Sequence, residues 1–338
     1  MSDEVPSAAH IFETGTGFRA SKVLLSAIEL GVFTVLSEQP LSLSVLTQRT
    51  GIAERGARDF FDSLVALGFL TRDAQGRYAN TPDTDFYLDG KKSTYIGALF
   101  EQYNAIGFGL WTSLTEALRT GSPQIGTSAA SHFGTTYRDA EQFRTFVKSM
   151  TAGSLLTAKA IAMQFPWRDY KTLVDVGTAE GCLAVQVALA HPHIRGGGFD
   201  LPELREPFEA YVAQHDLSAR LQFYAGDFFK DPLPPADVLV FGRILHNWGD
   251  DAKRLLLRKA YNSLSEGGAI IVYETLIPDD RRADAAGLLA SLNMLLWTPA
   301  GSDFTVADCV AWMQDAGFRE ARAETLAGAD GMVIGKKP

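Results

Sequence analysis

Hydrophobic residues recur at helical spacing through the first half of the chain, which predicts a series of helices there. This spacing occupies residues 20–36, 43–50 and 54–67, and two longer, aromatic-rich helices are predicted over 86–120 and 140–165. Residues 71–79 read instead as a hairpin around the turn Asp73-Ala74-Gln75-Gly76. Helix, turn, helix and hairpin in this order are the outline of a winged helix.

After Pro166 the pattern changes to short apolar strands that alternate with helices. Strands are predicted over 172–176, 197–200, 221–224, 237–241 and 269–273, and helices over 181–190 and 252–264. A turn is predicted at Glu266-Gly267-Gly268, and a closing hairpin is predicted from residues 322–325 and 332–336. This alternation is typical of an α/β fold with a doubly wound parallel sheet, to which the hairpin adds antiparallel strands at one edge.

Composition narrows the class of protein. A length of 338 residues suggests about two domains, and the patterns divide the chain into a winged-helix-like segment (1–90), a helical linker and pocket region (91–165) and the α/β domain (166–338). The net charge of −9 makes nucleic acid a poor partner. No apolar run reaches the roughly 18–20 residues that cross a bilayer. The first residues lack a secretory signal and there are two cysteines, so a reduced, cytoplasmic protein is expected.

The first strand of the α/β part runs into the loop Asp175-Val176-Gly177-Thr178-Ala179-Glu180-Gly181. Glycines at a strand-to-helix turn let a ligand approach the backbone closely. The spacing differs from the Gly-x-Gly-x-x-Gly of dinucleotide sites. It suits S-adenosylmethionine, which has no pyrophosphate to place but has an ammonium group that carbonyls and acids can bind. The alternative interpretation of this segment is a plain tight turn.

Acidic residues follow the next two strands at the same predicted edge of the sheet. Asp200 ends the second strand, where a carboxylate can accept hydrogen bonds from both ribose hydroxyls. Asp227 and Phe228 follow the third strand and could bind the edge and cover the face of an adenine; the alternative is an exposed loop with core phenylalanines. Ligands of open α/β sheets bind outside the carboxyl ends of the strands, so these acids and Asp175 indicate one cofactor site.

A histidine lies just past the fourth strand, in Arg243-Ile244-Leu245-His246-Asn247-Trp248. Histidine is the usual general base near neutral pH, because its ordinary pKa is about 6.5. Glu274 ends the fifth strand and would lie beside His246, where a carboxylate can set the tautomer of an imidazole and stabilise the imidazolium. Asp303 could do the same from a later loop, or it could cap the helix that begins near Thr305.

Together these segments resemble a known family. The glycine loop, Phe199-Asp200-Leu201-Pro202, Gly226-Asp227-Phe228-Phe229 and the His246 segment occur in the order and spacing of the plant caffeate-type and bacterial small-molecule O-methyltransferases, which include hydroxyneurosporene and acetylserotonin methyltransferase relatives. The resemblance covers nearly the whole chain. It implies a Rossmann-like class I methyltransferase sheet, an N-terminal all-helical winged-helix dimerisation domain and a homodimer.

The resemblance also implies roles for individual residues. His246 falls on the general base, and Glu274 and Asp303 fall on the two acids that flank it. The positions that match cofactor-binding residues are Asp175, Gly177, Gly181, Asp200, Leu201, Asp227, Phe228 and Arg243. The implied reaction transfers the methyl group of S-adenosylmethionine to a hydroxyl of a small, phenolic or enolic metabolite of secondary metabolism.

The acceptor pocket is expected to be mostly apolar with a few placed polar groups. Its candidate residues come from the middle helices and from the segment before residue 298, and they are Tyr103, Phe108, Trp111, Phe133, Phe146, Met150, Asn293, Met294 and Trp297. The alternative for each aromatic or methionine is an ordinary place in the core. The amide of Asn293, just before an apolar run, needs a polar partner.

The chain departs from the family pattern at two places. Thr178-Ala179-Glu180 replaces the usual glycine-rich stretch, and Glu180 could crowd or repel the carboxylate of the cofactor. Asn247 replaces the customary aspartate, a change expected to alter only the loop. Methylation of nitrogen or carbon stays open, as does a relative that binds S-adenosylmethionine but hydroxylates, decarboxylates or catalyses a pericyclic reaction, for which His132 could serve.

Other classes of protein fit less well. A winged helix could belong to a DNA-binding regulator, but the would-be recognition helix over 54–67 has no net positive charge. A nicotinamide-dependent dehydrogenase would need the phosphate-binding glycine spacing. A metal site is not expected, because His191 and His193 are the only close histidine pair and no cysteine or carboxylate cluster accompanies them.

Overall fold

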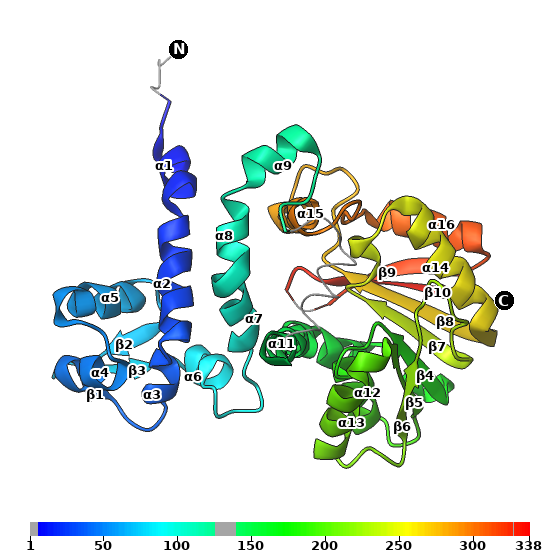
Figure 1. The fold of residues 1–338 in the computed structure, drawn as a ribbon, viewed down its shortest axis with the longest axis horizontal. Coiled ribbons are helices and arrows are strands. Elements are labelled where there is room, and N and C mark those ends of the chain that lie inside the picture. The colour runs from blue at the N-terminus through cyan, green and yellow to red at the C-terminus, as the bar shows by residue number, and fades with distance from the viewer. Residues whose placement is uncertain (1–5, 126–139, 327) are drawn as a thin grey trace. The chain divides into compact units, whose positions relative to one another are not determined.

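The computed structural model describes residues 6–125, 140–326 and 328–338. The chain forms two compact units, Met1–Gly109 and Leu110–Pro338 (Figure 1). The division into three functional segments stays a prediction. Within the described ranges, no helix is long and apolar enough to cross a membrane.

The first unit combines short helices with a small antiparallel sheet. Its helices are α1 (Ala9–Thr16), α2 (Phe18–Glu29), α3 (Val32–Val35), α4 (Leu43–Thr50), α5 (Glu54–Ala66), α6 (Pro82–Leu88), α7 (Gly97–Gln102) and the π-helix η1 (Tyr103–Gly107), and α8 (Phe108–Trp111) begins in it. The sheet has the order β1-β3-β2, with strands β1 (Leu41–Ser42), β2 (Leu70–Arg72) and β3 (Arg77–Asn80). The predicted hairpin is therefore confirmed, and the unit is mainly rather than entirely helical.

Two predicted helices are interrupted. Residues 20–36 form parts of α2 and α3, because Gly31 between them has a φ of +65°, which an α-helix does not accommodate. Residues 86–120 form several short elements instead of one long helix. The side chain of Asp89 accepts the backbone N–H of Lys91 at 3.1 Å, in a turn that competes with helix continuation.

The second unit is built on a seven-stranded sheet with the order β6-β5-β4-β7-β8-β10-β9. Its strands are β4 (Thr172–Val176), β5 (Arg195–Asp200), β6 (Leu221–Ala225), β7 (Ala236–Gly242), β8 (Leu264–Glu274), β9 (Arg319–Thr325) and β10 (Gly331–Lys336). The strands β4 to β8 pair in parallel, whereas β10 is antiparallel to both β8 and β9. The predicted parallel sheet with an antiparallel hairpin at one edge is confirmed.

Helices cover both faces of this sheet (Figure 1). The helices of the second unit are α9 (Leu114–Thr120), α11 (Ala140–Gln164), η2 (Trp167–Asp169), α12 (Cys182–Ala190), η3 (Pro202–Leu204), α13 (Arg205–Gln214), η4 (Leu245–Asn247), α14 (Asp250–Ser263), α15 (Ala285–Trp297) and α16 (Val306–Ala316). On β7, Val238 and Val240 pack in the core with α11, α12 and α13. Leu239 and Phe241 pack in the opposite core with α14 and α16. Because successive side chains of a strand point to opposite faces of the sheet, β7 contributes residues to two separate cores.

The predicted turn at Glu266-Gly267-Gly268 lies inside β8. Gly267 does have a φ of +74°. Its N–H nevertheless donates to the carbonyl of Lys337 at 3.1 Å, and the N–H of Lys337 donates to the carbonyl of Gly268 at 2.8 Å. Pairing with the end of the chain therefore keeps this segment in the sheet.

The parallel strands end at one rim, and this rim organises the site. Val176 of β4 lies opposite Phe199 of β5 and Phe241 of β7. Gly242 of β7 lies opposite Tyr273 of β8. The loops that follow these four strands therefore start side by side.

Candidate active site

The loop after β4 requires two of its glycines. Gly177 has a φ of +76° and Gly181 a φ of +90°, both in the left-handed region. A Cβ on Gly177 would lie 2.2 Å from Cδ1 of Ile244, and a Cβ on Gly181 would lie 2.5 Å from the ring of Phe208. Because Ile244 follows β7, the glycine loop packs directly on the segment that carries His246.

Two acidic residues near the ends of β4 and β5 are held by neutral donors. Asp175 is buried, and its Oδ2 accepts the hydroxyl of Thr178 at 2.8 Å. Asp200 is half-buried and accepts the backbone N–H groups of Ala179 at 2.9 Å and Leu201 at 2.8 Å. Burial raises the pKa of Asp175 to about 7 and the pKa of Asp200 to about 6. The structure thus brings these predicted cofactor residues together with the glycine loop.

Asp227 and Phe228 lie in a tight turn after β6. Asp227 accepts the backbone N–H of Phe229 at 2.9 Å, and its ion pair with Lys230 at 2.8 Å lowers its pKa. The ring centroid of Phe228 lies 4.8 Å from that of Phe229 and 6.0 Å from that of Trp248. The half-buried Phe228 is therefore part of an aromatic cluster next to η4, and its contact with an adenine stays a prediction.

Arg243 is held by a partner that the sequence did not reveal. Its backbone φ is +54°, and its Nη2 lies 2.7 Å from Oδ2 of Asp330, which is buried between β9 and β10. The same carboxylate accepts the hydroxyls of Thr157 at 2.5 Å and Thr275 at 3.0 Å. No spacing relates position 330 to position 243, so only the packing of the hairpin against the rim shows this network.

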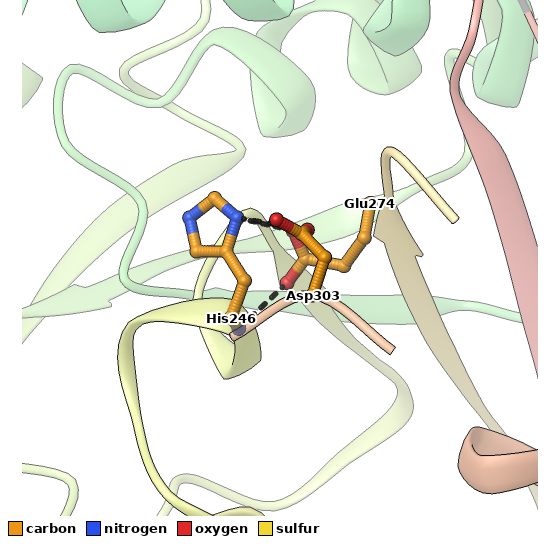
Figure 2. Close-up of side chains that lie close together, drawn as sticks. All are labelled: His246, Glu274 and Asp303. Atoms are coloured by element: carbon orange, nitrogen blue, oxygen red, sulfur yellow. Dashed lines mark hydrogen bonds and ion pairs between the residues drawn. The ribbon is translucent and has the colours of Figure 1, made fainter. Parts of the chain in front are cut away.

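His246 meets two buried carboxylates, as predicted. Nδ1 of His246 lies 3.2 Å from Oε2 of Glu274 and 3.4 Å from Oδ1 of Asp303. The other oxygen of Glu274 accepts the backbone N–H of His246 at 3.3 Å. Figure 2 shows the imidazole with one nitrogen turned toward the carboxylates and the other turned away from them. This arrangement places the proton of a neutral imidazole on Nδ1 and leaves the lone pair on Nε2.

The carboxylates set the basicity of this histidine. Burial lowers the pKa of His246, but the charges of Glu274 and Asp303 outweigh that effect, so the pKa lies above its ordinary value. Burial also raises the pKa of Glu274 to about 7. The imidazolium form of this group therefore loses its proton less readily than a free imidazolium does. Once His246 is neutral, its Nε2 is a strong proton acceptor.

Asp303 does not cap a helix. Thr305 caps α16 instead: its hydroxyl accepts the N–H of Asp308 at 3.0 Å, and the carboxylate of Asp308 accepts the N–H of Thr305 at 3.0 Å. The capping alternative for Asp303 is therefore wrong, and its carboxylate is free to face His246.

The ligand atoms of His246, Glu274 and Asp303 lie within 4.8 Å of one another, a spacing compatible with a cation as well as with a shared proton. We interpret the group as an acid–base centre, because one imidazole nitrogen faces both carboxylates at ion-pair distance and the other does not. That the protein needs no metal stays a prediction.

The candidate acceptor residues lie in different parts of the structure. Trp111 and Asn293 meet directly, with Nε1 of Trp111 donating to Oδ1 of Asn293 at 3.1 Å, which is the partner that the amide required. Met294 is buried on α15 beside half-buried Trp297, and Phe146 and Met150 are half-buried on α11. Tyr103 and Phe108 belong to the first unit, and Phe133 and His132 lie outside the described residues. A shared pocket for these residues stays a prediction.

Glu180, the main departure in the glycine loop, has a partner within the protein. Its carboxylate accepts the hydroxyl of Thr151 of α11 at 2.5 Å. Burial raises its pKa, which favours the neutral form near the loop. A carboxyl group held in this way repels an anionic ligand less than a free carboxylate would.

Comparison with known proteins identifies both units. The model of the O-methyltransferase dimerisation domain matches residues 12–90, and the model of the O-methyltransferase domain matches residues 111–319. The histidine centre and the glycine loop both lie inside the second match.

Individual relatives match over almost their full length. The tetracenomycin polyketide synthesis 8-O-methyl transferase TcmO of Streptomyces glaucescens is 42% identical, over 97% of this chain and 96% of that protein. The N,N-dimethyltransferase OxyT of Streptomyces rimosus is 34% identical, over 99% and 98%. The crystal structure of human N-acetylserotonin methyltransferase in complex with SAM superposes with a TM-score of 0.90 at 28% identity, covering 100% of this chain and 99% of that one. The chain therefore belongs to the O-methyltransferase family and contains both its dimerisation domain and its methyltransferase domain.

Proposed function

We propose that the protein transfers the methyl group of S-adenosylmethionine to a hydroxyl of a small aromatic molecule, and that His246 removes the hydroxyl proton. The observation that carries the proposal is the pairing of Nδ1 of His246 with Glu274 and Asp303. This pairing leaves the basic nitrogen Nε2 turned away from the two carboxylates (Figure 2), in a segment that packs on the glycine loop.

The rim fits the cofactor. Asp175 and Asp200 are carboxyl groups held only by hydroxyl and amide donors, so they retain acceptor capacity for the ribose hydroxyls and for positive charge. Gly177 has a left-handed φ of +76°, and the absence of a side chain there lets the loop turn sharply after β4 and pack on Ile244. When bound, S-adenosylmethionine supplies the electrophilic methyl group. The residues that would hold it are Asp175, Gly177, Gly181, Asp200, Leu201, Asp227, Phe228 and Arg243.

The protein's own residues position the acceptor and manage one proton. Nε2 of His246 accepts the proton as the hydroxyl oxygen attacks, and general-base help of this kind contributes about 10²–10⁴-fold to a rate. The carboxylates of Glu274 and Asp303 stabilise the imidazolium that results. The base and the cofactor residues share one rim, so the remaining contribution is orientation.

The acceptor is proposed to be a phenol or enol on an aromatic ring. The name of TcmO is that of an oxygen-methylating enzyme. The name of N-acetylserotonin methyltransferase contains that of a hydroxylated aromatic substrate. In this chain, the Trp111–Asn293 pair leaves the amide hydrogens of Asn293 available as donors to such a ligand. The name of OxyT makes an amine the second candidate acceptor, since His246 could deprotonate an ammonium group as well.

We also infer a homodimer. The dimerisation domain match covers residues 12–90. Apolar side chains of α1 and α2 are exposed, with 74% of Ile11, 70% of Phe12 and 57% of Phe18 accessible. Apolar surface of this kind marks an interface between protein chains. Sedimentation should give twice the 36.7 kDa mass of one chain, and a monomer at micromolar concentration would contradict the inference.

The experiment is binding followed by transfer. Calorimetry should show one site per chain for S-adenosylmethionine and for its demethylated product. With methyl-labelled cofactor, N-acetylserotonin, 2-naphthol and polyhydroxylated anthraquinones are then offered beside matched amines such as 2-naphthylamine. Label on oxygen supports the proposal, and label on nitrogen alone replaces it by N-methylation. Absence of binding by both cofactor forms would overturn it.

A further inference from the structure

A lysine is buried beneath the histidine centre. Lys253 of α14 has no exposed surface. Its Nζ donates to the backbone carbonyl of Ser302 at 2.9 Å and lies 3.2 Å from the hydroxyl of the same residue. Ser302 directly precedes Asp303, so the lysine is tied to the loop that delivers one of the two carboxylates to His246.

The surroundings of this lysine suit a positively charged side chain. Nζ lies 5.1 Å from the ring centroid of Phe304 and 5.1 Å from that of Trp312. Burial lowers the pKa of Lys253, and Asp250, 3.6 Å away at the surface, opposes that effect. A buried ammonium group without compensation is costly, and aromatic faces and carbonyl oxygens supply that compensation.

Other charged and titratable groups face the same region. Glu274 on β8 and Asp303 on the loop before α16 act on Lys253 as negative charges. Arg243, after β7, lowers the pKa of His246. Cys309 on α16 is buried, and burial raises its pKa, so it stays a neutral thiol. Among the described residues, Lys253 is therefore the basic side chain that is both buried and bonded to the Asp303 loop.

We propose that Lys253 is a positioning residue for the acid–base centre: it fixes the loop that carries Asp303 and offsets part of the negative charge of Glu274 and Asp303. The proposal rests on the proposed function only in that His246 is the base. Nothing in the match to the O-methyltransferase family assigns this position a role.

The charge of Lys253 has a defined effect on the proton of the centre. The reactive form has neutral His246 and two ionised carboxylates. Without the nearby ammonium group this form is more negative, so its last proton is held more tightly, whichever residue carries it. Removing the charge must therefore move the last deprotonation to higher pH, by about one pH unit for a neighbouring charge of this kind.

Two variants and one matched control test the proposal in the full chain. Lys253→Met removes the charge and the hydrogen bond, and Lys253→Gln removes the charge but keeps a donor for the carbonyl of Ser302. The control is Arg254→Met, because Arg254 is the next residue of α14, lies 6.0 Å from the ring of Trp312 and pairs with Asp315, away from the Asp303 loop.

The readout is the titration of the His246 ring, followed by NMR with carbon-13-labelled histidine and assigned by comparison with His246→Gln. Both Lys253 variants should shift the midpoint upward by about one pH unit, while Arg254→Met leaves it in place. With an acceptor in hand, kcat should fall about tenfold in Lys253→Met and less in Lys253→Gln, with the cofactor Kd unchanged.

An unshifted midpoint in folded Lys253 variants would overturn the proposal. Loss of the fold in both variants would assign Lys253 to the core and would overturn it too, although an apolar replacement for a buried charge is often tolerated. Failure of the proposed function looks different: His246→Gln would then keep its methyl-transfer rate, whatever the Lys253 variants do.

Discussion

Two pairs of acidic residues at the rim of the sheet are built in opposite ways. Asp175 and Asp200 receive only neutral donors, from the Thr178 hydroxyl and from backbone N–H groups. Glu274 and Asp303 face an imidazole, with a buried ammonium group behind the Asp303 loop. Among the described residues, no cationic side chain contributes to the pKa of the first pair.

The difference separates binding from chemistry. The first pair has incomplete partners and so is suited to a ligand that brings hydroxyls and positive charge. The second pair has its countercharges within the protein and so is suited to tuning a base that stays in place. If this is correct, changes at one pair should alter affinity for the cofactor and changes at the other should alter turnover.

The largest expected effect is the loss of turnover when the general base His246 is replaced. His246→Gln is expected to lower kcat by about 10²–10⁴-fold, because no base then takes the proton of the substrate hydroxyl in the transition state. The cofactor Kd should change less than about twofold, since the pair at β4 and β5 is untouched. Single-turnover rates and calorimetry on the same preparation check both values. A kcat close to that of the parent would remove the contrast between the two pairs.

The next effect concerns affinity. Asp200→Asn is expected to weaken cofactor binding by about 10- to 100-fold, the worth of a charged hydrogen bond, while kcat at saturating cofactor changes little. Glu203→Gln is the control, because Glu203 is an exposed acid three residues away. Calorimetric titration of both variants decides the point. An equal loss in the two would show that net charge, rather than the carboxylate of Asp200, matters.

The two pairs should also answer differently to pH. Asp200 has a pKa of about 6, so cofactor affinity should improve as pH rises through 6 and then level off. His246 has a pKa above its ordinary 6.5, so kcat should keep rising to higher pH before it levels off. Kd and kcat profiles from pH 5 to 9 test this order. Coinciding midpoints would mean that a single titration controls both steps.

The smallest expected effect is on stability. Burial raises the pKa of Asp175 from 3.8 to about 7, so its contribution favours the fold below pH 4 and is lost as pH rises toward 7. Asp175→Asn should therefore become more stable than the parent as pH rises, by about 1 kcal/mol or more at pH 7.5, which is about 2–4 °C in Tm. Thermal scans from pH 4 to 8 measure the trend.

A control of opposite sign is available on β7. The pKa of Asp237 is lowered: burial works against this, but the backbone N–H groups of Lys171 and Thr172 outweigh it. Its ionised form supports the fold above pH 4, so Asp237→Asn should lower Tm at pH 7.5. Parallel changes in Tm for the two variants would contradict the assignment of an unfavourable charge to Asp175.

Much of this architecture could be predicted because the relevant signals are local. The strands β4 and β7 are short apolar runs. Asp200, His246 and Glu274 stand at or just past strand ends, which the topology brings to one rim. The glycine loop could be predicted from the spacing of Gly177 and Gly181 after the first strand. The prediction of one long helix over 86–120 is wrong, because the turn at Asp89 depends on its carboxylate accepting the backbone N–H of Lys91.

The rest depends on contacts between distant segments. Asp330 bonds Arg243 and Lys253 bonds Ser302 only after the hairpin and α14 have packed. A lone acid in a Gly-rich turn and a lysine on an amphipathic helix both read as surface residues. Their burial follows from the shapes of neighbouring elements, which no single stretch of sequence encodes.

The contact between Thr178 and Gly198 constrains how this loop can change over time. A Cβ at Gly198 of β5 would lie 2.2 Å from Cγ2 of Thr178, although the backbone of Gly198 would otherwise accept a side chain. A residue larger than glycine at position 198 therefore requires a residue smaller than threonine at position 178. The two positions therefore impose an order on substitution: β5 can gain a side chain at position 198 only after position 178 has become smaller than threonine.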